Sequence, residues 1–416
     1  MKHRAIYTWV LLSAVSVTAA RAAELPRVKP AEVGMSARKL GEVDVAVTKL
    51  VTEKKLAGAV VTIARHGRIV LHKPYGQMDI EARKPMRTDT IMRIYSMSKP
   101  ITSAAALMLH DDGKLDIDAP VSTYISAFKA LLVYRKDGPV APQREMIVRD
   151  LLRHTSGLTY GLSGGTGVDA MYRKANVLDR GSTLAVMCKR LGGIPLAYEP
   201  GKDWRYSVST DVLGRVVEVA SGTSLDAFFA ERLFKPLDMK DTAFFVPDDK
   251  LERFAANYAS NRRGKLTLKD APARSRYRKR PARLSGGGGL VSTARDYMRF
   301  CVMIANGGTF QGTRLLKADT VKLMTTNQLP EGLGWIRLGA RRVGIGFGLG
   351  LSVCVKPSRW DTSAKVGECG WGGAASTHFW ISPPAGLAVV TMEQTQPYSP
   401  LVERAVKGII YAAIGK

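Results

Sequence analysis

A chain of 416 residues is long enough to bury a large hydrophobic core, in one large domain or in two. Its composition, 45% hydrophobic and 24% charged, is that of a globular protein, and its formal net charge is +26. The six histidines are scattered and no C-x-x-C is present, so we expect neither a metal site nor a cofactor.

The first 22 residues differ from the rest of the chain. Lys2 and Arg4 give a basic start, residues 5–20 are apolar and rich in small side chains, and Ala20-Arg21-Ala22 supplies an A-x-A cleavage site. We therefore expect a signal peptide over residues 1–22 and a secreted, periplasmic protein. The alternative is an uncleaved membrane anchor, but the apolar stretch is short for a membrane span. No other segment approaches that length, so we expect no stable membrane anchor.

The following part of the chain predicts a helix and then a hairpin. Apolar residues at helical spacing between residues 35 and 52 indicate an amphipathic helix. Residues 57–64 and 68–72 are β-rich, and the His66-Gly67 pair between them predicts the turn of a β-hairpin.

After a long stretch of helical character, β-rich runs return near the C-terminus. They cover residues 347–355, 370–381 and 387–392, and a final helix is expected at residues 401–414. Strands at both ends, with helices between them, predict a sheet that the two termini complete together.

The expected fold class is therefore α/β (α+β), with an antiparallel sheet flanked by helices and a large, mostly helical region. The α/β region covers about residues 30–95 and 325–416, and the helical region about residues 96–324. We expect residues 23–416 to form a single domain.

The chain is organised around Ser96 and Lys99. They precede an apolar, alanine-rich run of helical length that ends before Gly113. If the helix begins near Ser96, the two side chains lie one turn apart, and the amine can accept the hydroxyl proton if burial lowers its pKa. This S-x-x-K spacing is typical of acyl-transferring serine enzymes. It also occurs by chance, so an ordinary helix start is the alternative.

Four further stretches accompany this motif. They are L-L-R-H-T-S-G-L at residues 151–158, E-P-G-K-D-W-R-Y-S-V at 199–208, a glycine-rich stretch within 284–295 and G-W-G-G-A-A at 370–375. In this order and at these separations, the set resembles the penicillin-recognising serine hydrolases, the class C β-lactamase-like superfamily. The resemblance is closest to the family VIII carboxylesterases and runs from about residue 30 to the C-terminus. It implies a β-lactamase/transpeptidase-like fold.

The resemblance implies a role for three side chains. Ser96 corresponds to the acylated nucleophile, Lys99 to its amine partner and Tyr206 to the tyrosine of the Y-x-N element. The chemistry suits Tyr206, because a phenol beside an ammonium has a lowered pKa and can transfer a proton.

The third family element, K-T-G, is matched by Trp371, Gly372 and Gly373. The glycines let a substrate lie against the strand. The backbone N–H of Ala374 would form the oxyanion hole together with that of Ser96. The alternative for Trp371 is core packing.

Two departures from the family pattern bear on the substrate. Trp371 replaces the K-T-G lysine that attracts a carboxylate, and Val208 replaces the asparagine of Y-x-N. Both changes remove polar groups that select a charged amide, so we expect a carboxylesterase acting on short-chain esters. The alternatives are a β-lactamase or D-amino-acid peptidase of the same fold, with a β-lactam or peptide substrate, and a catalytically silent protein that binds envelope material.

A second serine pattern is a decoy. Residues 161–165 fit G-x-S-x-G around Ser163, but this nucleophile elbow needs a strand before it and a helix after it. The histidine of a Ser-His-Asp triad could only be guessed, for example His154 or His378, and we expect structural roles for both.

Residues 262–283 carry ten lysines and arginines against one acid, Asp270. We expect a solvated, mobile surface loop, with contact to envelope polyanions as the second interpretation. Nucleic acid is not expected, because only Tyr277 offers a stacking side chain there. Elsewhere, Cys354 and Cys369 could pair in an oxidising compartment, which the sequence leaves open.

Overall fold

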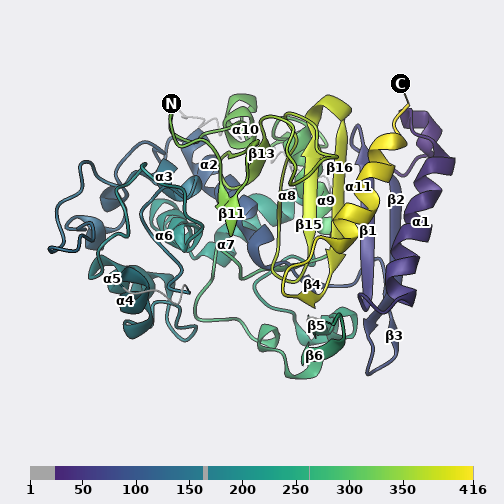
Figure 1. Cartoon of the computed structure of the whole chain (residues 1–416), viewed down its shortest axis with the longest axis horizontal. Helices are drawn as coiled ribbons and strands as arrows, with labels where there is room; N and C mark the ends of the chain where they lie inside the picture. The colour runs from purple at the N-terminus through teal and green to yellow at the C-terminus, as the bar shows by residue number, and fades with distance from the viewer. Residues whose placement is uncertain (1–23, 163–166, 262, 416) are drawn as a thin grey trace, which may run out of the picture.

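The computed structural model describes residues 24–162, 167–261 and 263–415 (Figure 1). The signal peptide expected at residues 1–22 and the decoy Ser163 lie outside these ranges. Within them, no helix is both long enough and apolar enough to cross a membrane.

An eight-stranded sheet forms the centre of the molecule, and every neighbouring pair in it is antiparallel. In spatial order its strands are β12 (Ile345–Phe347), β13 (Ser352–Cys354), β14 (Cys369–Gly372), β15 (His378–Ser382), β16 (Leu387–Glu393), β1 (Gly58–Arg65), β2 (Arg68–Asp79) and β3 (Lys84–Pro85). The two ends of the chain meet where β1 pairs with β16, from Ala59 opposite Glu393 to Arg65 opposite Leu387. The expected sheet, completed by both termini, is confirmed.

The expected hairpin is also confirmed. The turn between β1 and β2 places His66 and Gly67 at φ values of 50° and 72°, a left-handed pair that suits the twist of a tight hairpin. The C-terminal runs differ in detail. The expected strand at 347–355 is two short strands, β12 and β13, and the run at 370–381 is β14 and β15 with a turn between them.

Helices cover both faces of the sheet. One face carries α1 (Ala37–Thr52) and α11 (Leu401–Ala412), which pack on each other, and the opposite face carries α9 (Ala294–Ala305) (Figure 1). Successive side chains of β1 point to opposite faces, so Val61 joins the apolar cluster under α1 and α11, whereas Val60 joins the main core. This explains why β1 and β16 are apolar along almost their whole length.

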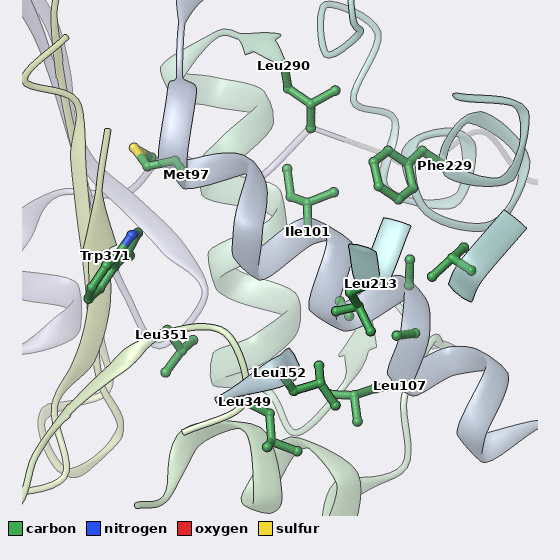
Figure 2. Packing of buried hydrophobic residues seen from close by; sticks show 14 of the residues in the cluster. Met97, Ile101, Leu107, Leu152, Leu213, Phe229, Leu290, Leu349, Leu351 and Trp371 are labelled. Atoms are coloured by element: carbon green, nitrogen blue, oxygen red, sulfur yellow. The ribbon is translucent and has the colours of Figure 1, made fainter. Parts of the chain in front are cut away.

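The helical region is built around α2 (Ser98–Asp111), in which every residue from Ser98 to Leu109 is buried. A helix that is apolar all round must be enclosed by other elements. Figure 2 shows Ile101 and Leu107 of α2 in one apolar cluster with Leu152 and Leu213 from two neighbouring helices. The other helices here are α3 (Val148–Leu152), α4 (Val168–Lys174), α5 (Leu184–Gly192), α6 (Ser209–Ser221), α7 (Leu225–Phe229), α8 (Lys235–Leu237) and α10 (Ala318–Thr325).

The basic segment 262–283 lies at the surface, but much of it is regular structure rather than a loop. β6 (Leu266–Asp270) pairs with β5 (Asn257–Ser260), which in turn pairs in parallel with β17 (Thr395–Gln396). Asp270 forms an ion pair with the buried Arg93. Tyr277, 5% exposed, packs against Phe254 and is not free to stack on a base. The expectation of a mobile loop is therefore wrong for this part of the chain, because Asp270 and Tyr277 anchor it.

The cysteines are free. Cys369 lies opposite Val353 in the β13–β14 pair, and Cys354 is one residue further along β13. Adjacent residues of a strand point to opposite faces. Cys354 and Cys369 are therefore separated by the sheet itself and form no disulfide.

Candidate active site

Ser96 lies in a short 3-10 turn, Tyr95–Met97, that leads directly into the buried helix α2. The strand before it, β4 (Met92–Arg93), pairs with β7 (Val291–Ser292) and sets the direction from which the chain enters the turn. Tyr95 has a φ of 41°, a conformation that bulky side chains rarely adopt. The Ser96 hydroxyl is thus held at the N-terminus of α2, where the helix dipole favours an anion.

Lys99 lies beneath Ser96, and its side chain is completely buried. Its Nζ donates to three oxygens: Ser96 Oγ at 3.4 Å, the Tyr160 hydroxyl at 3.0 Å and the Gly287 carbonyl at 2.6 Å. These three acceptors use the full donor capacity of an ammonium group. The Nζ also lies 4.5 Å from the centre of the Tyr206 ring, a cation–π contact.

The pKa of Lys99 moves opposite to the expectation from the sequence. Burial lowers this pKa, but the phenols of Tyr160 and Tyr206 raise it by more, and the net direction is upward. This direction favours the ammonium form of the amine. The amine donates to the Ser96 hydroxyl in the resting state instead of accepting its proton.

Tyr160 belongs to this cluster although the sequence analysis did not select it. Burial raises its pKa, and the neighbouring Lys99 charge opposes that shift. The only signal was its position, two residues beyond the stretch 151–158. The chain reaches that point through Gly157, whose φ of 87° and close approach to the Tyr198 carbonyl leave no room for a side chain.

The glycine-rich stretch within 284–295 also contributes to the cluster. Gly287 provides the carbonyl that accepts from Lys99, and a Cβ on this residue would lie 2.6 Å from the Asp211 carboxylate. Ser285 donates to the same carboxylate, while Thr102 of α2 donates to the Gly286 carbonyl. These contacts fix the backbone that accepts from the lysine.

Tyr206 lies on the cavity side of Lys99, at the end of a turn that precedes α6. Its hydroxyl accepts a hydrogen bond of 3.3 Å from the Trp371 indole, and the two rings lie 5.5 Å apart. Trp371 is 7% exposed and also packs edge-on against Phe347. Trp371 therefore lines the cavity and is also packed in the core.

The end of β14 lies directly against the chain that leads into Ser96. A Cβ on Gly373 would collide with the Ile94 carbonyl, and the Gly373 N–H donates to Thr377. Ala374 is exposed and lines the same cavity as Ser96. In the described part of the chain its backbone N–H has no acceptor, so it is available to a ligand.

Ser96, Tyr206 and the glycine strand open into a cavity of about 940 Å³. Val208 does not contribute to it, because this residue is fully buried at the start of α6. Of the two departures from the family pattern, only Trp371 therefore lines the cavity. No group of three histidine, cysteine or acidic side chains suited to a metal ion occurs among the described residues.

The two histidines considered from the sequence lie near the site without contacting Ser96. His154 Nδ1 lies 3.3 Å from Ser207 Oγ, and burial and Lys99 hold its pKa well below the usual range. His378 Nε2 lies 3.4 Å from Glu403, and burial lowers its pKa to about 3. Neither forms a triad with Ser96.

The chain is similar to known proteins in both sequence and structure. The Beta-lactamase family model matches residues 43–413. Esterase EstB of Burkholderia gladioli is 31% identical over 370 residues, which cover 85% of this chain and 89% of that protein. The structure of EstCE1, a hydrolase with promiscuous acyltransferase activity, superposes with a TM-score of 0.79 at 27% identity, covering 90% of this chain and 99% of that chain.

A solved family VIII carboxylesterase has the same fold, with a TM-score of 0.70 at 20% identity over 91% of this chain and 99% of that chain. This likeness concerns the fold, while the resemblance drawn from the motifs is confirmed by the family model and by the esterase relative at 31% identity.

Proposed function

Because the chain belongs to the β-lactamase family and is a serine hydrolase of that fold, we propose that it is a carboxylesterase that acts on short-chain esters through an acyl-enzyme on Ser96. The observation that carries this proposal is the hydrogen bond from the buried Lys99 to Ser96 Oγ, beside two tyrosines. An ordinary helix start has no reason to bury a lysine against a serine.

The proposed mechanism begins with the loss of one proton from the cluster of Lys99, Tyr160 and Tyr206. The cluster then accepts the proton of Ser96 while Oγ attacks the ester carbonyl. Because Lys99 is an ammonium at rest, the fraction of enzyme with this base available rises with pH. Tyr206, on the cavity side, is placed to pass the proton to the leaving alcohol.

The oxyanion formed by this attack would be stabilised by the backbone N–H groups of Ser96 and Ala374. The alcohol leaves, and a water molecule that loses its proton to the same cluster releases the carboxylic acid. Support for the strand's role comes from the free Ala374 N–H and from the close contact of Gly373 with Ile94.

The preference for esters rests on Trp371. In the position of a lysine that would attract a carboxylate, the site has an indole packed on Tyr206 and Phe347. Hydrolysis of β-lactams or D-amino-acid peptides by the same serine is the second candidate, and a silent envelope-binding protein is the third.

The test compares hydrolysis of p-nitrophenyl butyrate and nitrocefin by the protein and by Ser96→Ala. Ser126→Ala, at an exposed position outside the cavity, is the matched control. We expect ester turnover that depends on Ser96 and exceeds nitrocefin turnover. Faster nitrocefin hydrolysis would favour the lactamase. Failure of a phosphonate to label Ser96 would favour the silent protein, and full activity in Ser96→Ala would refute the mechanism.

Export is part of the same proposal and rests on the sequence of residues 1–22 alone. N-terminal sequencing of the protein recovered from the periplasmic fraction should begin at Ala23. Recovery of the protein from the cytoplasm with its Met1 intact would contradict export.

A further inference from the structure

The cavity that contains Ser96 has a second wall, formed by residues between β11 (Ala340–Arg341) and β14. Arg342, Arg359 and Trp360 line this wall, and Arg404 of α11 lines the cavity nearby. Across residues 24–162, 167–261 and 263–415, none of these arginines forms an ion pair with a carboxylate. The wall therefore carries guanidinium groups that have no carboxylate partner among the described residues.

The acidic side chains of the cavity do not supply the missing partner, because they are engaged with a different cation. Asp361, Glu368 and Glu403 all form ion pairs with the buried Lys407. Glu368 also accepts from the Tyr411 hydroxyl. The cavity thus contains three carboxylates that share one ammonium and, separately, arginines that have no carboxylate partner.

Two of the donors are buried. Arg342 Nε and Trp360 Nε1 are shielded from solvent and have no hydrogen-bond partner among the described residues. They are enclosed by protein, so they are not the donors that meet a bound molecule. The Nη groups of Arg342 are not among these enclosed atoms and form no hydrogen bond with the described residues, so they are the donors that a molecule in the cavity can reach.

The wall is held in a defined shape. The Arg342 and Arg359 guanidinium groups each lie 5.5 Å from the centre of the Trp360 ring. Ser358 connects the two segments: its hydroxyl donates to the Val343 carbonyl at 2.7 Å and accepts from the Trp360 N–H at 3.3 Å. The donors are therefore positioned before any ligand arrives, which reduces the entropy lost on binding.

The size of the cavity fits a ligand that reaches this wall. About 940 Å³ is at the upper end of the range of pockets that enclose whole drug-sized molecules, and a butyrate ester would leave most of it empty. Guanidinium groups match the planar geometry of carboxylate and phosphate oxygens.

We propose that Arg342 and Arg359, held in place by Trp360 between them, bind an anionic group, a carboxylate or a phosphate, that the substrate carries away from its reactive ester. This inference rests on the proposed esterase function and adds its substrate class. Trp371 removes the cation next to the serine, and this wall supplies cations at another place in the same cavity.

The test uses pairs of esters that differ in charge. On the acyl side, p-nitrophenyl hydrogen glutarate, adipate and suberate, and an ω-phosphate analogue, are compared with p-nitrophenyl esters of the matching uncharged acyl chains. On the alcohol side, butyrate esters of ω-hydroxy acids and of ω-hydroxyalkyl phosphates are compared with butyrates of simple alcohols, by pH-stat titration. Arg342→Gln and Trp360→Leu are measured against Arg341→Gln, an exposed neighbour outside the cavity.

We expect kcat/KM to be at least about tenfold higher for an anionic ester in one of the two series, since a charge-assisted hydrogen bond carries that much. Arg342→Gln and Trp360→Leu should reduce this ratio several-fold, and Arg341→Gln should leave it unchanged. The ratio should also fall as salt is added. The series with the higher ratio tells which side of the ester carries the anion, and the analogues distinguish carboxylate from phosphate.

A protein that hydrolyses the uncharged esters but shows no preference in either series overturns the inference and leaves the esterase proposal intact. A preference that Arg342→Gln and Arg341→Gln reduce equally also overturns it, because general surface charge would then be the cause. Absence of turnover of every ester, charged or uncharged, refutes the esterase proposal itself.

Discussion

Replacement of Tyr160 by phenylalanine tests whether the tyrosines control the charge on Lys99. The change removes the hydroxyl that accepts from Nζ at 3.0 Å and keeps the ring. With one acceptor lost, burial opposes the ammonium more strongly, so the pKa of Lys99 falls. A hydrogen bond to a charged group contributes about 1.5–3 kcal/mol, and 1.36 kcal/mol corresponds to about one pKa unit. The acid limb of activity should move about 1 to 2 units to lower pH.

The direction of this pH shift follows from the proposed mechanism. The active form is the one in which the cluster has lost a proton, so the rate increases with pH up to the pKa of the cluster. A lower pKa in Tyr160→Phe therefore brings activity to lower pH, although the maximal rate falls if the phenol also helps proton transfer.

The assay is kcat/KM for p-nitrophenyl butyrate as a function of pH. Tyr124→Phe, which loses a hydrogen bond of 2.9 Å from the Asp116 N–H outside the cavity, is the matched control. An acid limb that does not move in Tyr160→Phe would refute the assignment of the raised Lys99 pKa to Tyr160. Loss of rate at every pH, with an unshifted limb, would instead make Tyr160 the group that transfers the proton.

Three further predictions concern packing and stability. Gly373→Ala should reduce ester turnover at least about tenfold with little change in circular dichroism, because the Cβ collides with the Ile94 carbonyl beside the serine; an unchanged rate would exclude close packing there. Arg93→Met should destabilise the protein by about 3 kcal/mol in urea unfolding, since it leaves Asp270 without its buried partner; Arg274→Met, at an exposed position, is the control. Burial raises the pKa of Glu393 to about 8, so the folded state keeps a proton that the unfolded state loses, and the free energy of unfolding falls between about pH 5 and 8. Glu393→Gln should weaken this dependence, and an identical slope would contradict it.

The fold could be predicted to a large extent because its signals are local. The apolar runs at β1 and β16, the His66-Gly67 turn and the helical spacing of α1 each follow from a few neighbouring residues. The division of residues 370–381 into β14 and β15 was missed because the turn between them is held by tertiary contacts, such as the hydrogen bond from Ser376 Oγ to the Thr395 carbonyl.

The site could be predicted as a set of residues but not as an electrostatic arrangement. Ser96 and Lys99 follow from their spacing, and Tyr206 from its resemblance to a family element. Whether Lys99 gains or loses a proton depends on the balance between burial and two tyrosines, one of which, Tyr160, belongs to a different part of the chain. The pKa of Lys99 depends on which side chains lie near it in the folded protein, and the spacing of residues in the sequence does not show that.

Val208 and the basic segment 262–283 show what the sequence could not reveal, which is where a side chain lies in the fold and what holds a segment in place. The sequence could not show that Val208, which stands in place of the family's asparagine, is buried at the start of α6 and does not line the cavity. For the basic segment, the many lysines and arginines correctly predicted that it lies at the surface. Composition could not show that Asp270 and Tyr277 are held by Arg93 and Phe254, residues distant in sequence.

The pairing of β1 with β16 has a consequence for the order of folding. The two strands are separated by more than 300 residues, so β1 has no partner on that side until nearly the whole chain is available. Until then, its backbone groups and apolar side chains form an open sheet edge, which invites aggregation. A chain that ends before residue 387 should therefore be insoluble as well as inactive, even though Ser96, Lys99, Tyr160 and Tyr206 would all be present.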